Sequence, residues 1–151
     1  MQVNVESLDA MKALGAQIGT ILRGGEVLEL IGDIGTGKTS FTKGLALGLG
    51  VDEDVQSPSF TISRTYEARD GLRLVHYDFY RLSDPGIMAN ELANVLEDLK
   101  TIVVVEWADV ARDVLPKERL TIHFSSPTET TRQLHFDAKG LATQRILGAI
   151  R

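Results

Sequence analysis

The sequence predicts an α/β fold in which helices are layered against one mixed sheet. Segments 26–31 and 101–106 are short, mostly apolar runs of the kind found in buried strands. Segments 7–22, 87–99 and 141–150 have the pattern expected of helices. Because strands and helices alternate, we expect parallel strands in the core of the sheet, with antiparallel strands flanking them.

The first third of the chain supplies one edge strand, two helices and a core strand. Two valines alternating with polar residues predict a short strand at the N-terminus. Ser7 is expected to cap the helix that follows, because its hydroxyl can accept a hydrogen bond from the first turn. A second helix begins at Thr39, directly after the first core strand, and Gly48 and Gly50 end it.

Two segment pairs predict antiparallel strands. Residues 59–66 and 72–80 alternate between apolar and polar character on either side of Asp70-Gly71, a dipeptide typical of hairpin turns. Residues 120–124 and 133–136 form the second pair. All 151 residues are expected to form a single domain, since the chain contains no linker, low-complexity stretch or internal repeat.

The turn after the first core strand carries a phosphate-binding motif. Residues 32–39 match G-x-x-x-x-G-K-T without a mismatch. Glycines allow backbone N–H groups to converge on an anion, and the N-terminus of the following helix adds its dipole. Lys38 is expected to reach the outer phosphates of a nucleotide, and the Thr39 hydroxyl to bind Mg²⁺. With its strand before and its helix after, the motif predicts the three-layer sandwich of P-loop NTPases.

Hydrolysis or transfer of a phosphate also needs carboxylates near the metal. Glu106 ends the second core strand, where it could hold the metal directly, hold it through water, or orient the attacking water. On an extended strand, His76, Asp78 and Tyr80 would share one face, and a buried Asp78 would need a metal or Arg81 as its partner. The alternative is that both acids are solvated groups at strand ends.

Other motifs are less specific. Residues 57–61, Ser-Pro-Ser-Phe-Thr, could close over a γ-phosphate as a switch loop, but their composition equally fits an ordinary turn. Trp107 could stack on a base or a partner, or simply pack in the core. The three histidines lack metal-ligand spacing, so we expect them to be structural or surface groups.

Composition limits the classes of function. The formal net charge of −5 argues against broad, unaided binding to nucleic acid. No apolar run approaches the roughly 20 residues of a membrane span, and the N-terminal residues do not have the pattern of a signal peptide. The chain has no cysteine, which excludes disulfides and fits the cytoplasm.

Taken together, these motifs resemble the TsaE (YjeE) family, small bacterial ATPases of tRNA threonylcarbamoyladenosine (t6A) biosynthesis. The matching segments keep the order and spacing of the family and are 32–41, 57–61, 76–82, 105–108 and 115–116. The phosphate loop is shared by many families, but the set that follows it is specific in combination.

The resemblance implies an ATPase that binds ATP and Mg²⁺, leaves ADP, and works with the TsaB and TsaD proteins on tRNA. That machinery places a threonylcarbamoyl group on N6 of adenosine 37 in tRNAs that read codons starting with A. TsaD carries out the transfer, and the TsaE protein supplies an ATP-driven step. No membrane is involved.

Matching the motifs residue by residue gives a predicted site. We expect nucleotide contacts from Gly35, Thr36, Gly37, Lys38, Thr39, Ser40, Ser59, Trp107 and Arg132. We expect metal contacts from Thr39 and Glu106, and catalytic roles for Lys38, Asp78 and Glu106. Two positions depart mildly from the family: Ser59 stands where threonine is usual, and Thr36 where alanine is common. Residues 91–99 lack a glycine and a Glu-Tyr pair often found there, which affects the local helix or a partner contact.

Three other functions share the phosphate loop. A small-molecule kinase would need an acceptor pocket and an arginine-rich lid, but the arginines in the middle of the chain are not densely clustered. A GTP-dependent switch protein would need an Asn-Lys-x-Asp motif, which is absent. A structural nucleotide-binding subunit would require that both Asp78 and Glu106 be idle.

Overall fold

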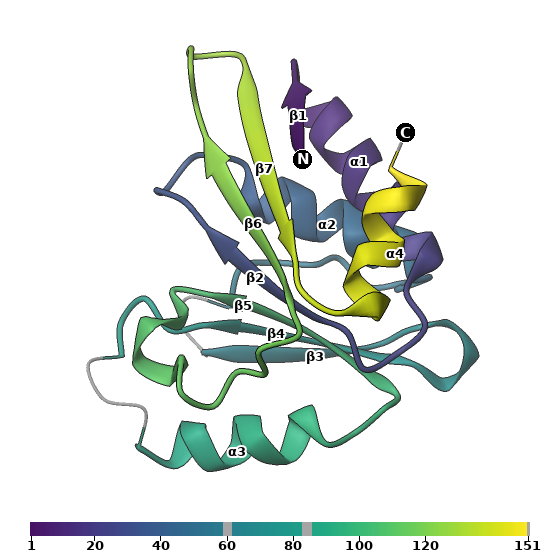
Figure 1. Ribbon diagram of the computed structural model, residues 1–151, viewed down its shortest axis with the longest axis vertical. Coiled ribbons are helices and arrows are strands. Elements are labelled where there is room, and N and C mark those ends of the chain that lie inside the picture. The colour runs from purple at the N-terminus through teal and green to yellow at the C-terminus, as the bar shows by residue number, and fades with distance from the viewer. Residues whose placement is uncertain (59–61, 83–85, 151) are drawn as a thin grey trace.

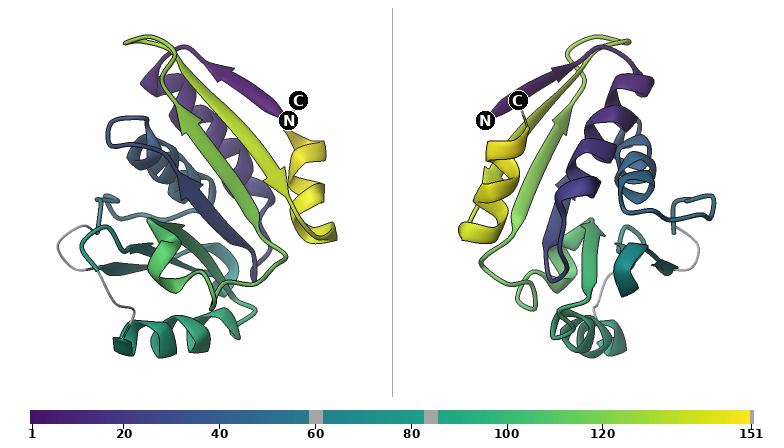
Figure 2. Two further views of the ribbon diagram at one scale, coloured as in Figure 1. Left: turned by 60° about the vertical axis from the view of Figure 1, so that its left-hand side comes forward. Right: turned by 90° about the vertical axis from the view of Figure 1, so that its right-hand side faces the viewer.

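The computed structural model describes residues 1–58, 62–82 and 86–150, which form a sheet between two layers of helices. Helices α1, α2 and α4 cover one face of the sheet, and α3 lies against the other face (Figures 1 and 2). The seven strands follow the order β1-β7-β6-β2-β5-β4-β3. This arrangement confirms the predicted α/β sandwich.

The elements run as follows. The strands are β1 (Gln2–Val5), β2 (Val27–Ile31), β3 (Ser63–Glu67), β4 (Arg73–Asp78), β5 (Thr101–Glu106), β6 (Leu120–Ser125) and β7 (Arg132–Ala138). The helices are α1 (Leu8–Ile21), α2 (Lys38–Gly48), α3 (Gly86–Leu96) and α4 (Leu141–Ala149), with short 3₁₀ turns η1 (Arg69–Gly71) and η2 (Ala108–Ala111).

The centre of the sheet is parallel and its margins are antiparallel. Strand β2 lies between β5 and β6 and is parallel to both, and β4 is parallel to β5. The pairs β1–β7, β6–β7 and β3–β4 are antiparallel. Register places Leu30 and Asp78 on either side of Glu106, so β2, β4 and β5 end together at one edge. Ligands of open α/β sheets bind beyond such an edge.

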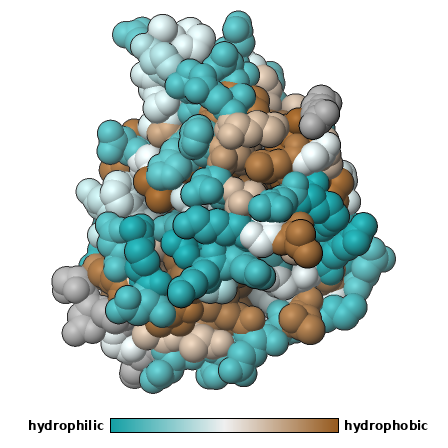
Figure 3. Space-filling view, viewed as in Figure 1, coloured by the Kyte–Doolittle hydropathy of each residue, from teal (hydrophilic) through white to brown (hydrophobic). Residues whose placement is uncertain are grey.

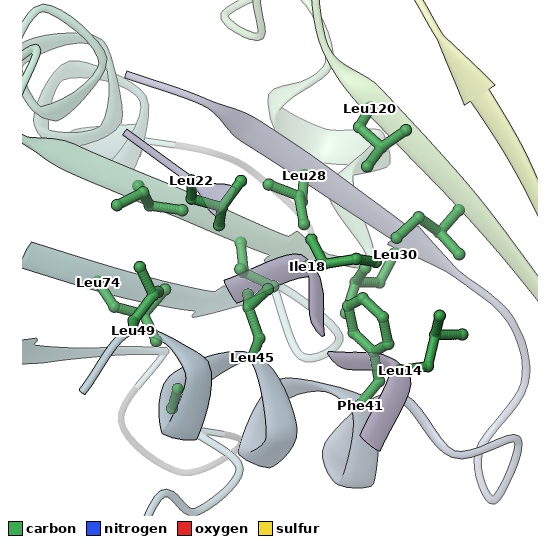
Figure 4. Close-up of a cluster of buried hydrophobic side chains, with 14 of the residues drawn as sticks. Leu14, Ile18, Leu22, Leu28, Leu30, Phe41, Leu45, Leu49, Leu74 and Leu120 are labelled. Atoms are coloured by element: carbon green, nitrogen blue, oxygen red, sulfur yellow. The ribbon is translucent and has the colours of Figure 1, made fainter. Parts of the chain in front are cut away.

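Apolar side chains fill both interfaces between the sheet and the helices. In the larger core, Leu28 and Leu30 of β2 point toward Ile18, Phe41 and Leu45 of α1 and α2, all buried (Figure 4). Valines of β2, β4 and β5 point the other way and belong to a second buried cluster, which includes Leu92 of α3. The nearly continuous apolar sequence of the central strands therefore reflects burial on both faces.

The second core, on the α3 side, contains one buried phenol. Tyr77 of β4 is fully buried and belongs to the same apolar cluster as Val103 and Val105 of β5 and Leu92 of α3. Burial raises the pKa of Tyr77 to about 12, and the negative charge of Glu91 adds to the effect. The phenol is therefore neutral throughout the physiological pH range.

The surface is mixed in hydropathy. Figure 3 shows hydrophilic side chains over much of the face viewed in Figure 1, with apolar groups between them. Within the described ranges, no helix is both long enough and apolar enough to cross a bilayer.

Glycines allow α1 and α2 to pack closely. A Cβ atom on Gly15 would lie 2.3 Å from the Phe41 carbonyl oxygen, and one on Gly44 would lie 2.0 Å from the Lys12 carbonyl oxygen. Any larger side chain at these positions would force the helices apart. The close approach holds α2, and therefore the loop that precedes it, firmly against α1.

Most predicted boundaries agree with the structure. Ser7 caps α1 by accepting a hydrogen bond from the Ala10 backbone N–H at 3.0 Å. The hairpin turn contains Asp70 and Gly71, both with positive φ, as the Asp-Gly pair predicts. Turn η2 had no signal in the sequence.

The predicted strands 59–66 and 72–80 are too long. Strand β3 begins at Ser63, and residues 59–61 lie outside the described residues. Strand β4 ends at Asp78, because Leu82 donates a backbone hydrogen bond to Phe79 and the chain turns there. The expectation that Tyr80 shares a strand face with Asp78 is therefore wrong.

One arginine joins the ends of the two packed helices. The Arg69 guanidinium donates hydrogen bonds to the carbonyls of Gly19, Thr20 and Leu22 at the end of α1. It also donates to the Gly48 carbonyl at the end of α2, at 3.2 Å. Carbonyls at helix ends have no partner within the helix, so a cation there satisfies them and opposes the helix dipoles.

Replacing Arg69 by methionine should lower the free energy of unfolding by about 2 kcal/mol, because a charge-assisted set of hydrogen bonds is lost while the apolar stem is kept. For a chain of this size we expect the melting temperature to fall by about 4–8 °C. Arg73→Met is the matched control, since its ion pair with Glu67 is largely exposed. Equal melting temperatures for the two variants would contradict this role of Arg69.

Candidate functional site

A cavity of about 590 Å³ opens where β2, β4 and β5 end. The residues that line it come from the phosphate loop, the first turns of α1 and α2, the segment before β3, the ends of β4 and β5 with the segments after them, and the start of β7. They are Leu8, Ile34, Gly35, Gly37, Lys38, Thr39, Ser40, Ser57, Asp78, Tyr80, Arg81, Glu106, Trp107 and Arg132.

The cavity gathers nearly all of the predicted site residues that the structure describes. The exception is Thr36, which is buried and whose hydroxyl donates to the Asp33 carbonyl at 2.8 Å. That bond fixes the shape of the loop from inside, so Thr36 contributes through its backbone conformation. Ser59 lies outside the described residues, and its contact with nucleotide stays a prediction.

The phosphate loop has the conformation that anion binding requires. Gly35 and Gly37 have φ values of 85° and 102°, which favour glycine. A Cβ atom on Gly37 would also lie 2.8 Å from the Met11 side chain. Gly37 offers no side-chain cap to α2, so the N–H groups of Thr39 and Ser40 are not capped from that position. A helix start of this kind is suited to a phosphate.

Lys38 lies at the centre of the site. Its ammonium donates a hydrogen bond to the Gly32 carbonyl and lies 3.8 Å from Oε1 of Glu106. It also sits 4.4 Å from the centre of the Trp107 ring. Trp107 has a left-handed backbone conformation, with φ 55° and ψ 51°, that turns the chain beside the lysine. The cation is thus held between a carboxylate and an aromatic face.

Two carboxylates stand opposite the loop. Asp78 and Glu106 are register partners at the ends of β4 and β5, and they are 6% and 4% exposed. Asp78 accepts a hydrogen bond from the Tyr80 backbone N–H at 3.0 Å. The alternative of two solvated strand-end acids therefore does not hold, since both are buried and still line the cavity.

These groups fit a magnesium ion shared with a nucleotide. In the described part of the chain, no three His, Asp or Glu side chains form a metal site by themselves. Mg²⁺ is usually held by one or two protein oxygens together with substrate phosphates and water. The Thr39 hydroxyl and the Glu106 carboxylate line one cavity, and both provide oxygen ligands of the kind that Mg²⁺ prefers.

His76 lies behind the cavity and contacts Glu106, a pairing that the sequence patterns did not predict. Its ring is 1% exposed, and its Nε2 lies 2.6 Å from Oε2 of Glu106. The available signal was its position two residues before Asp78 on one strand face. For His123 and His135 the expectation of surface groups is confirmed, because both are exposed on neighbouring strands.

Arg132 reaches the phosphate loop from the start of β7. Its guanidinium donates to the Gly35 carbonyl at 3.2 Å, and also to the carbonyls of Glu129 and Thr131. The Arg132 side chain thus joins the β6–β7 turn to the phosphate loop. Its contact with a nucleotide stays a prediction.

Three apolar groups at the cavity had not been predicted. Leu8 and Ile34 are 56% and 76% exposed at its border. Tyr80 is 55% exposed and its ring lies 4.8 Å from that of Trp107. No sequence pattern marks these residues, because their meeting depends on the packing of α1 and on the turn after β4.

Comparison with known proteins agrees with the family resemblance of the sequence motifs. A family model described as threonylcarbamoyl adenosine biosynthesis protein TsaE matches residues 5–134. The chain is 39% identical over 147 residues to a Bacillus subtilis protein named tRNA threonylcarbamoyladenosine biosynthesis protein TsaE, covering 91% of this chain and 84% of the relative. A Streptomyces coelicolor protein of the same name is 38% identical over 113 residues, covering 74% and 76% of the two chains. A crystal structure of YdiB from Bacillus subtilis superposes with a TM-score of 0.80 at 32% identity, covering 99% and 93%.

Proposed function

The chain belongs to the TsaE family, and from this premise we propose that it is a Mg²⁺-dependent ATPase that serves the formation of t6A on tRNA. The role in t6A formation follows from the family. The ATPase activity is the further step. It is supported chiefly by the convergence of a phosphate loop and two buried carboxylates on one cavity.

Each group has a role that its position supports. The backbone N–H groups at the start of α2 would bind phosphate oxygens, and Lys38 would neutralise charge on the outer phosphates. Thr39 and Glu106 would hold Mg²⁺, which supplies charge neutralisation to the β- and γ-phosphates when bound. Asp78 lies where it could orient the attacking water. The products are ADP and inorganic phosphate.

Nucleotide contacts outside the phosphates would come from the rest of the cavity wall. Arg132 lies beside the loop at Gly35, and Trp107 lies beside Lys38. Ser40 follows Thr39 in the first turn of α2, within reach of the inner phosphates. Ser59 belongs to the proposed switch loop.

We further propose that the partners are TsaB and TsaD, that tRNA is reached through this complex, and that the setting is the cytoplasm. In this scheme TsaD transfers the threonylcarbamoyl group, and the present chain couples ATP hydrolysis to repeated rounds of modification. The net charge of −5 supports contact with tRNA through partners rather than alone.

The proposal is tested by reconstitution with TsaB, TsaD, tRNA and an activated threonylcarbamoyl donor. We expect ATP to raise the yield of modified tRNA over many turnovers, with labelled γ-phosphate released to water as inorganic phosphate. A yield that does not respond to ATP would overturn the coupling. Label transferred to a metabolite would instead identify a small-molecule kinase, which the family relationship does not favour.

A further inference from the structure

We infer that His76 is a positioning residue that fixes the carboxylate of Glu106 for ATP hydrolysis. The inference rests on the proposed function and adds a residue to it. Glu106 lines the cavity, whereas His76 lies behind it in the interior of the sheet and is not among the lining residues. Any effect of His76 on the reaction must therefore pass through Glu106.

The strand register explains how the two side chains meet. In the parallel β4–β5 pair, Glu106 is the partner of Asp78, and Val104 is the partner of His76. His76 and Asp78 share one face of β4 because they are two residues apart. Glu106 therefore leans diagonally toward His76, and the two side chains meet with Nε2 of His76 2.6 Å from Oε2 of Glu106.

The two oxygens of Glu106 have different surroundings. Oε2 is bound to Nε2 of His76 at 2.6 Å, inside the protein. Oε1 is turned toward the Lys38 ammonium, 3.8 Å away. One oxygen is thus fixed from within, and the other is presented to the groups that would meet phosphate and metal.

Hydrogen-bonding capacity identifies the donor. An ionised carboxylate can only accept hydrogen bonds, so Nε2 of His76 must carry a proton in this pair. Nδ1 is buried, and the described residues offer it no hydrogen-bond partner. Nε2 is therefore the ring nitrogen that acts on Glu106, and it does so as the donor.

Loss of this donor should affect the metal-dependent step more than nucleotide binding. Without it, Oε2 would be a buried oxygen with an unsatisfied charge, and the side chain would turn away from its productive position. Partners that orient metal ligands typically change metal affinity or activity by about 10–100-fold when they are removed.

The test compares two neutral amides at position 76. The donor of His76→Gln can reach the place of Nε2, whereas that of His76→Asn is too short. We expect His76→Asn to lower kcat by about 10–100-fold with little change in KM, and His76→Gln to recover most of the loss. His123→Asn, on the exposed face of β6, is the matched control and should behave as the parent protein.

Calorimetry of ADP binding, with Mg²⁺ and with EDTA, gives a readout that does not depend on turnover. In His76→Asn the gain in affinity caused by Mg²⁺ should shrink by about 10-fold, while affinity in EDTA stays at the parental value. A parent protein that releases no phosphate would refute the proposed hydrolysis, but this measurement would still decide the role of His76.

Three results would overturn the inference. The first is a folded His76→Asn variant with parental kcat and a parental response to Mg²⁺. The second is an equal loss of activity in both amide variants with no change in the Mg²⁺ response, which would indicate a structural role alone. The third result applies if His76→Asn does not fold. In that case, a folded His76→Gln variant whose ADP affinity no longer rises with Mg²⁺ would overturn the inference.

Discussion

Replacing Glu106 by glutamine is expected to lower the rate of ATP hydrolysis by about 100-fold or more, while ADP affinity measured without metal stays within about threefold of the parental value. The amide has nearly the same shape as the carboxylate and can still accept a hydrogen bond from His76. It cannot hold Mg²⁺ with a charge or activate a water molecule. Steady-state phosphate release and ADP calorimetry measure the two effects separately.

Asp109→Asn is the matched control for this variant. Asp109 lies three residues downstream on η2, its carboxylate is 84% exposed, and it does not line the main cavity. Its variant should hydrolyse ATP at the parental rate. Parental hydrolysis by Glu106→Gln as well would show that the proposed role of Glu106 is wrong.

Replacing Lys38 by alanine should weaken the binding of ATP by about 10- to 100-fold and reduce hydrolysis at saturating nucleotide. A charge-assisted hydrogen bond to phosphate contributes about 1.5–3 kcal/mol, which corresponds to this range of affinity. The variant also leaves Glu106 without its nearby cation. Calorimetric titration with ATP in EDTA isolates the contribution of the lysine from that of the metal.

Lys43→Ala controls for the removal of a lysine from the same helix. Lys43 lies one and a half turns further along α2 and does not line the main cavity. We expect its variant to bind ATP as the parent does. If Lys38→Ala bound ATP just as well, the phosphate would have to be held elsewhere.

The features that the sequence predicted well are local ones. The phosphate loop needs glycines, a lysine and a threonine within eight consecutive residues, so it can be recognised from the sequence without knowledge of the fold. The buried strands that end at Ile31 and Glu106 are equally visible, because burial on both faces demands continuous apolar residues. Together they place the phosphate loop and Glu106 at the ends of two core strands.

What escaped prediction depends on contacts between distant segments. The bond between His76 and Glu106 requires the parallel pairing of β4 with β5 in one register, and neither strand specifies that register alone. The border of the cavity likewise needs Leu8 from α1 to meet Ile34 of the loop. The end of β4 at Asp78 follows from a turn whose hydrogen bonds form only in the folded chain.

The position of Trp107 has a practical consequence. It is the only tryptophan in the sequence, and its indole lies 4.4 Å from the ammonium of Lys38 and beside the ring of Tyr80. A bound phosphate that drew that ammonium away would change the electric field at the indole, and we expect the emission of Trp107 to change with it. Trp107 would then act as an optical reporter, with which stopped-flow fluorescence could follow nucleotide arrival and departure without a label.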